Sequence, residues 1–344
     1  MGLVLGLALL IWLVGGWARL SVRTRFIGVA GLFLAVLAEH LLLADGHPLR
    51  VATGGSAFAW LALGVVAALV LAYRQVLRRL RARSVTAAAP AVSDRFRPVE
   101  LDRYSRHIML REIGGPGQQA LQGARVLVVG AGGLGSPVLL YLAGAGVGTI
   151  GVIDDDVVDN SNLQRQVIHT DARIGMPKVF SAELQMRALN PFITVLPYHR
   201  RLTEAEAPLF ADYDLILDGS DNFDTRYLVN RLAVSAGKPL ISAAITQWEG
   251  QIGLYDPARG GPCYQCLFPE RPAPGLVPSC AEAGVVAPLP GVIGAMMALE
   301  AVKVVTGAGQ GLRGRLLIYD GLYADVRVIG AERREECPVC GVKH

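Results

Sequence analysis

Three glycines and one aspartate have the types and spacing of residues that bind a nucleotide. Gly130, Gly132 and Gly135 form the pattern G-x-G-x-x-G between an apolar run and a segment with helical apolar periodicity. Glycines at these positions permit a tight turn and let a phosphate approach the backbone N–H groups at a helix start. Asp154 ends the next apolar run, where a carboxylate can accept the hydroxyls of a ribose. These residues predict a βαβ unit that binds a nucleotide.

The segment after Asp154 separates two kinds of nucleotide chemistry. A glycine turn alone is typical of NAD-dependent oxidoreductases, and it is sometimes only a site of tight packing. Residues 157–166 are instead polar and cationic, and Lys178 follows a Gly-Met-Pro turn. Cations beside a nucleotide neutralise the charge of its phosphates. We therefore favour chemistry at the phosphates, and we keep an NAD-dependent Rossmann oxidoreductase as the alternative from another enzyme class.

Four of the five cysteines form two C-x-x-C pairs, Cys263 with Cys266 and Cys337 with Cys340. Four thiolates complete a tetrahedral structural Zn²⁺ site, although only a tertiary fold can join pairs so far apart in the chain. Redox pairs or plain buried cysteines are the competing interpretations. The fifth, Cys280, lies in a stretch rich in proline and glycine that we expect to be a loop, where the thiol either reacts or stays inert.

The N-terminal third carries three apolar runs, for which we predict membrane-spanning helices at residues 2–18, 26–43 and 56–73. Each is about the length that a helix needs to cross a hydrocarbon core of ~30 Å. Glu39 and His40 interrupt the second run near one end, where a polar side chain can reach the interface. With 52% hydrophobic residues and a positive mean hydropathy, the chain is too apolar for a purely soluble protein.

The arginines test the number of spans. Three arginines lie between the first two runs, only Arg50 lies between the second and third, and a cluster begins at Arg74. Three spans satisfy the positive-inside rule, and they place everything after Arg74 in the cytoplasm. We thus expect a multi-pass protein of the inner (cytoplasmic) membrane, and not a cleaved signal peptide. The basic cluster lacks interleaved aromatic residues, which argues against nucleic acid as a partner.

The order of the motifs resembles one family. The segments GAGGLG, DDDVVDNSNLQRQ, GMPK, DGSDN, CYQC, SCAEAGVVAPLPGVIG and CPVC are similar to the MoeB/ThiF family of ubiquitin-activating-like adenylyltransferases, closest to molybdopterin-synthase adenylyltransferase. The match covers roughly residues 100–341, and RYSRH at 103–107 resembles the family's N-terminal arginine motif. We expect a membrane anchor at 1–83, which has no counterpart in the family's usual pattern, then a linker at 84–98 and the adenylyltransferase domain at 99–344.

The resemblance implies an α/β fold with a Rossmann-like ATP-binding domain, a mixed central sheet and a structural zinc site. It implies ATP, Mg²⁺ and Zn²⁺ as cofactors, with Asp221 holding Mg²⁺ and the four paired cysteines holding Zn²⁺. The nucleotide-binding residues it implies are Gly130, Gly132, Gly133, Gly135, Asp154, Ser161, Asn162, Leu163, Gln164, Arg165, Lys178, Asp221 and Asn222. Asp218 is either a second acidic metal partner or a turn residue.

The catalytic residues that the resemblance implies are Arg106, Arg165, Lys178 and Asp221, with the role of Cys280 left open. Arg106 corresponds to an arginine that reaches into the neighbouring subunit, and it implies a homodimer. The substrate implied is the C-terminal carboxylate of a ubiquitin-like sulfur carrier that ends in Gly-Gly. The small subunit of molybdopterin synthase is the first expectation and the thiamine-pathway carrier the alternative. We expect a separate protein to donate the sulfur.

Overall fold

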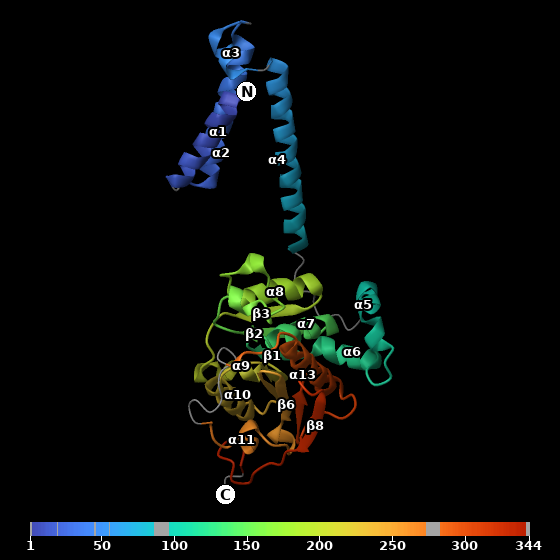
Figure 1. The fold of residues 1–344 in the computed structure, drawn as a ribbon. Helices are drawn as coiled ribbons and strands as arrows, with labels where there is room; N and C mark the ends of the chain where they lie inside the picture. Colours follow the sequence, from blue (N-terminus) through green and yellow to red (C-terminus); the bar gives the residue numbers. More distant parts are fainter. Residues whose placement is uncertain are drawn as a thin grey trace. The chain divides into compact units, whose positions relative to one another are not determined.

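The computed structural model describes residues 2–18, 20–44, 46–54, 56–85, 96–272 and 283–341. The chain divides into two compact units, Met1–Val92 and Ser93–His344, and each is described by itself (Figure 1).

The first unit is helical. It contains α1 (Gly2–Trp17), α2 (Val22–Leu42), α3 (Pro48–Thr53) and α4 (Ala57–Val85). Val4, Val36 and Trp60 form its small interior. The helix α4 continues to residue 85 and so overlaps the first two residues of the linker that we predict at 84–98. The stretch after Arg74 is rich in leucine, arginine and alanine, which favour helix and explain why α4 extends past its apolar part.

Two segments of this unit, Thr24–Leu42 and Ala57–Val76, are long and apolar enough to cross a membrane by length and composition. The helix α1 is also apolar but has only 16 residues. Polar groups of this unit lie where α2 meets α3: the ring Nε2 of His40 lies 3.0 Å from the hydroxyl of Thr53. A third helix of sufficient length, Pro288–Thr306, belongs to the second unit, where it is partly buried in the core.

The second unit is built on an eight-stranded sheet of order β3-β2-β1-β4-β5-β6-β7-β8 (Figure 1). The strands are β1 (Arg125–Val129), β2 (Thr149–Ile153), β3 (Thr194–Tyr198), β4 (Leu215–Asp218), β5 (Leu240–Thr246), β6 (Glu249–Tyr255), β7 (Arg315–Asp320) and β8 (Asp325–Gly330). The first five are parallel, and β6 to β8 add antiparallel strands. The predicted Rossmann-like α/β fold with a mixed sheet is confirmed.

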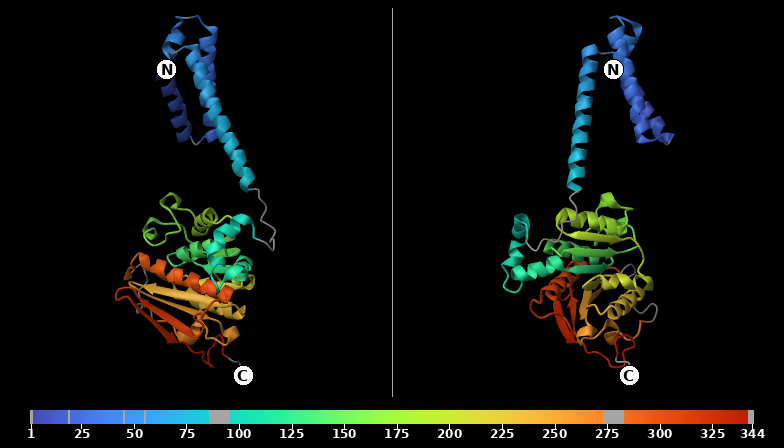
Figure 2. Two further views of the ribbon diagram at one scale, coloured as in Figure 1. Left: turned by 90° about the vertical axis from the view of Figure 1, so that its right-hand side faces the viewer. Right: turned by 180° about the vertical axis from the view of Figure 1, so that it is seen from behind.

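Helices cover both faces of the sheet because its parallel strands are apolar on both sides. The helices of the unit are α5 (Pro98–Ile108), α6 (Gly114–Gly123), α7 (Gly135–Ala145), α8 (Lys178–Leu189), α9 (Ala207–Ala211), α10 (Phe223–Ser235), α11 (Tyr264–Leu267) and α13 (Pro288–Thr306). Along β1, Val126 and Val128 pack with α7, α8 and α13, whereas Leu127 and Val129 pack with α10. Figure 2 shows α13, in orange-red, along one face of the sheet.

A close backbone contact joins β1 to α7. A Cβ on Gly135, the first residue of α7, would overlap the carbonyl oxygen of Gly130, the residue after β1. Only glycine therefore lets the helix begin so close to the end of the strand.

We expect Gly135→Ala to lower the thermal unfolding temperature of the protein by about 6–12 °C, because it forces the turn and the helix apart. Gly144→Ala is the matched control. It lies on the same helix, where an added Cβ meets only a methyl of Leu189 at 4.0 Å, and alanine favours helix more than glycine does. Equal unfolding temperatures for the two variants would contradict this account of the turn.

Candidate active site and four-cysteine site

A cleft of about 610 Å³ opens at the carboxyl ends of β1, β2 and β4. These strands end level with each other, because Val129 is paired with Ile153 on one side and with Asp218 on the other. The strand order reverses between β1 and β4, which is where doubly wound sheets bind their ligands. Of the predicted residues, the cleft is lined by Gly130, Gly132, Gly133, Asp154, Arg165, Lys178, Asp221 and Asn222.

The glycine turn forms one wall of this cleft. Gly130 has a φ of +92°, which glycine adopts without strain, and its N–H donates to the carbonyl of Ile153 over 2.9 Å. Gly132, Gly133 and Leu134 line the cleft just before α7, so the backbone N–H groups of this turn can face an anion. Within α7 itself, the N–H of Ser136 donates to the carbonyl of Gly132 over 2.9 Å and Pro137 has no N–H. The turn therefore has the geometry of a phosphate-binding loop.

A buried histidine, which sequence reasoning missed, fixes the backbone of the turn. The Nε2 of His169 lies 2.9 Å from the carbonyl oxygen of Ala131, and its Nδ1 lies 2.9 Å from the hydroxyl of Ser181. A carbonyl only accepts, so Nε2 carries the proton and Nδ1 accepts from Ser181. Burial lowers the pKa of His169 and so favours this neutral form.

Asp154 connects the end of β2 to the glycine turn. Its carboxylate accepts the N–H of Ala131 and the N–H of Asp156, each over 2.8 Å. Burial raises the pKa of Asp154, and these two backbone donors and the charge of Lys178 partly oppose that rise. Each carboxylate oxygen has a second acceptor site, so the group can still receive ribose hydroxyls.

Two cations face the cleft, each held in place by a neighbour. Lys178 is buried, and its ammonium donates to the carboxylate of Asp156 over 2.7 Å. Arg165 donates to the side-chain oxygen of Asn162 over 3.0 Å and to the carbonyl of Ser161 over 3.2 Å. Asp156 is solvent-exposed, so a triphosphate can replace it as the partner of Lys178 at little cost.

Sequence reasoning missed several other residues of the cleft, including Arg200, Arg201 and Gln166. Arg200 and Arg201 follow β3 and line the cleft beside the aspartates that follow β2. Gln166 lines it as well and is buried, yet its side-chain oxygen has no hydrogen-bond partner among the described residues. A buried unpaired amide oxygen is costly, so Gln166 is prepared to accept a bond from a bound ligand.

The loop after β4 carries Asp221 into the cleft. Asp221 is exposed there, and Asn222 caps α10 by accepting the N–H of Thr225 over 2.8 Å. Asp218 lies beneath this loop, fully buried, and accepts bonds from Ser220 and Ser242. The structure thus favours the turn role of Asp218 over that of a second acidic metal partner.

The remaining predicted residues lie outside the cleft lining. Gly135 supports the glycine turn from below, and the residues Ser161, Asn162, Leu163 and Gln164 form a short turn that positions Arg165. Arg106 is on the exposed face of α5 and does not line the cleft of its own chain. Cys280 lies outside the described residues.

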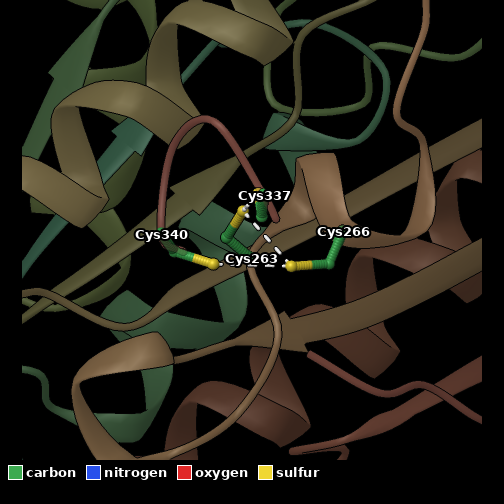
Figure 3. A group of neighbouring side chains, drawn as sticks. All are labelled: Cys263, Cys266, Cys337 and Cys340. Carbon is green, nitrogen blue, oxygen red and sulfur yellow. Dashed lines mark hydrogen bonds between the residues drawn. The ribbon is translucent and has the colours of Figure 1, made fainter. Parts of the chain in front are cut away.

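The four paired cysteines meet at one point, although the two pairs are far apart in the chain (Figure 3). The sulfur atoms lie within 4.8 Å of one another, with 3.5 Å between Cys263 and Cys337 and 3.4 Å between Cys266 and Cys340. A tetrahedral site with Zn–S bonds of about 2.3 Å needs sulfur atoms about 3.8 Å apart. All four are buried free thiols, so the donor set fits a structural Zn²⁺.

Polar groups around the cysteines suit thiolate ligands. The side-chain N–H of Asn230 donates to the sulfur of Cys263 over 3.7 Å, and the backbone N–H of Arg334 donates to the sulfur of Cys266 over 3.5 Å. Burial and the neighbouring sulfur of Cys266 raise the pKa of Cys263. A bound cation would offset that cost by stabilising the thiolates.

Comparisons with known proteins support the interpretation of the cleft as a nucleotide-binding site. Residues 104–339 match the ThiF family. The chain belongs to this family. It is 51% identical over 252 residues to a sulfur carrier protein adenylyltransferase of Thermus thermophilus, a match that covers 72% of this chain and 93% of the relative. It is 48% identical over 243 residues to the SAMP-activating enzyme E1 of Haloferax volcanii, covering 70% and 89%. The MoeB/ThiF resemblance is confirmed, and this ThiF protein is a nucleotidyltransferase.

A solved structure supports the same fold. The crystal structure of E. coli MccB with MccA-N7isoASN superposes with a TM-score of 0.63 at 24% identity, covering 70% of this chain and 75% of that one. At this identity the likeness concerns the fold alone. The ThiF match begins at residue 104, after the helical first unit.

We expect the purified protein to contain about one zinc per chain, and Cys337→Ser to lose the metal because three thiolates and a hydroxyl bind Zn²⁺ more weakly. The free energy of unfolding should fall by about 3 kcal/mol or more. Mass spectrometry of the metal content and thermal unfolding measure both effects. Cys280→Ser is the control and should keep the metal. Retention of full zinc by Cys337→Ser would exclude the tetrahedral site.

Proposed function

We propose that this ThiF protein transfers the adenylyl group of ATP to the C-terminal glycine carboxylate of a ubiquitin-like sulfur carrier and releases pyrophosphate. The observation that carries the proposal is the make-up of one cleft: a phosphate-binding turn, the Asp154 carboxylate, the cations Arg165 and Lys178, and the exposed carboxylate of Asp221. The name of the Thermus thermophilus relative supports the substrate class.

This reaction needs charge neutralisation and alignment more than proton transfer. A chain-terminal carboxyl has a reference pKa of roughly 3.3–3.7, so at neutral pH it is already the nucleophile. An anion must nevertheless approach the α-phosphate of a polyanion. Lys178 and Arg165 are fixed by Asp156 and Asn162 before ATP arrives, so little reorganisation is needed when charge moves toward the leaving pyrophosphate.

Asp221 would hold Mg²⁺. Its exposed carboxylate supplies the hard oxygen ligand that Mg²⁺ prefers, and Mg²⁺ often takes only one or two protein carboxylates. When bound, the ion supplies further neutralisation of the phosphates. The Zn²⁺ of the four-cysteine site would be structural, because all four positions of its tetrahedron are filled by protein ligands.

Among sulfur carriers we propose the small subunit of molybdopterin synthase, with the thiamine-pathway carrier as the alternative. A relative described as the probable adenylyltransferase/sulfurtransferase MoeZ of Mycobacterium tuberculosis shares 51% identity over 243 residues, which cover 62% of its length. Sulfur would come from a separate donor protein. Whether Cys280 forms a covalent link to the carrier is left open.

We also propose a homodimer in which Arg106 completes the cleft of the partner subunit. Arg106 is exposed, and it does not line the cleft of its own chain. The helix that carries it is firmly attached, since Tyr104 on α5 accepts a hydrogen bond from the side chain of Asn190 over 2.8 Å. An arginine on a fixed helix can contact phosphates of a neighbouring site without a large entropic cost.

We expect Asp221→Asn to lower carrier-dependent ATP–pyrophosphate exchange by at least about 100-fold, because the amide keeps the shape but removes the charge that attracts the metal. The exchange is measured with each purified carrier ending in Gly-Gly. Asp224→Asn is the matched control: Asp224 is exposed three residues later and does not line the cleft. Absence of exchange with every carrier, or binding of NAD without binding of ATP, would exclude the proposed function.

For the first unit we propose three membrane spans, with the catalytic unit in the cytoplasm. The two long apolar helices and α1 support the spans, and the arginine distribution supports the orientation. Alkaline phosphatase fused after residue 47 should be active, and fusions after residues 20 and 90 should be inactive. Green fluorescent protein at the same sites should give the opposite pattern. The same reporter active at residues 47 and 90 would rule out this topology.

A further inference from the structure

A buried arginine on α10 supports the loop that carries Asp221. Arg226 is only 6% exposed, and its terminal Nη2 donates to the carbonyl of Ser220 over 2.8 Å. Its backbone N–H donates to the carbonyl of Asn222 over 3.2 Å. Ser220 and Asn222, which flank Asp221, therefore both accept a hydrogen bond from Arg226.

The strand end holds this loop from the other side. Asp218 accepts the N–H of Ser220 over 3.0 Å and its hydroxyl over 2.6 Å. The Nε of Arg226 lies 3.7 Å from the other carboxylate oxygen of Asp218, an ion pair buried on both sides. Burial alone would lower the pKa of Arg226, but the charge of Asp218 together with the contacts to Tyr264 and Tyr255 raises it overall. Arg226 stays charged, and the loop is fixed between two opposite charges.

The four-cysteine site supports Arg226 from beneath. The Cζ of Arg226 lies 6.0 Å from the centre of the Tyr264 ring, within the range of a cation–π contact. Tyr264 belongs to the first C-x-x-C segment, and its N–H donates to the side-chain oxygen of Asn230 over 2.9 Å. Asn230 also donates to the sulfur of Cys263. One helix thus contacts the Asp221 loop through Arg226 and the cysteine site through Asn230.

We propose that Arg226 is a positioning residue that holds Asp221 in its Mg²⁺-binding place, and that Tyr264, fixed by the four-cysteine site, holds Arg226. The proposal rests on the proposed function, in which Asp221 binds the Mg²⁺ that accompanies ATP. Arg226 borders the cleft, but its guanidinium is directed to Ser220 and Asp218 and acts on the nucleotide through the loop.

The geometry predicts which replacements matter. Lysine keeps the charge of Arg226, but a single ammonium cannot bond to Ser220 and face Asp218 with the planar fork of a guanidinium. Leucine at position 264 removes the aromatic face that Arg226 contacts and the hydroxyl that bonds to it, whereas the backbone bond to Asn230 is kept. Arg231 provides a control on the same helix, because it is exposed and pairs with Glu204 over 2.7 Å.

The test measures ATP binding by the full-length protein as Mg²⁺ is titrated. We expect Arg226→Lys and Tyr264→Leu each to raise the Mg²⁺ concentration for half-maximal enhancement of binding by about tenfold or more, since a charged hydrogen bond to the loop is weakened. ATP binding without Mg²⁺ and the zinc content should stay within about twofold of wild type. Arg231→Lys should match wild type throughout.

The double variant Arg226→Lys/Tyr264→Leu should be no worse than Arg226→Lys alone, because both residues act on the loop through one guanidinium. An unchanged Mg²⁺ requirement in Arg226→Lys would overturn the proposal, as would weakening of ATP binding to the same extent with and without Mg²⁺. Should Arg226→Lys fail to fold, the response of Tyr264→Leu decides. No carrier-dependent exchange by a wild type that shows Mg²⁺-enhanced ATP binding would instead reject the proposed function alone.

Discussion

The contact between Gly135 and the carbonyl of Gly130 is the constraint on which the rest of the catalytic unit depends. Because no Cβ intervenes, α7 starts directly against the end of β1, and the residues before it, Gly132 to Leu134, border the cleft. The same closeness brings Ala131 within reach of the Asp154 carboxylate and the His169 ring. The strand end, the helix start and the Asp154 carboxylate thus form one rigid corner, in which the backbone N–H groups of the turn need no rearrangement to meet an anion.

The two cations of the cleft, Lys178 and Arg165, already have partners before a nucleotide arrives. Lys178 is buried but not isolated, since Asp156 neutralises it from the solvent side. Because Asp156 is exposed, the ion pair costs little to replace. Arg165 is oriented by Asn162 in the same way. The cations are thus aimed at the cleft, while the groups that hold them are easily displaced by phosphate.

The sequence predicted those parts of the site that depend on local pattern. The glycine turn and Asp154 follow from one βαβ unit, and the C-x-x-C pairs are visible as spacing. Other features depend on contacts between distant segments and had no local signal. His169 reaches Ala131, 38 residues away, and Arg226 acts through loop and cysteine-site contacts. For Asp218 the sequence left a metal role and a turn role open, and only the strand pairing shows that it lies buried beside Ser242. The three apolar runs marked α1, α2 and α4 but not the short α3, and helix propensity beyond Arg74 decided where α4 ends.

The cysteine pairs also constrain the chain between them. Residues 267–336 lie between Cys266 and Cys337, and this segment contains α13. Closing so long a loop restricts the unfolded chain, so a metal bound by both pairs favours the fold that α13 requires. The start of α13 packs against the glycine turn. A Cβ on Gly133 would approach Pro290 at 3.3 Å, and one on Gly294 would overlap Pro137 of α7. The cysteine site therefore supports the cleft by two routes, through α10 to the Asp221 loop and through α13 to the glycine turn. A metal far from the reacting atoms can for this reason be essential to the shape of the nucleotide site without any part in the chemistry.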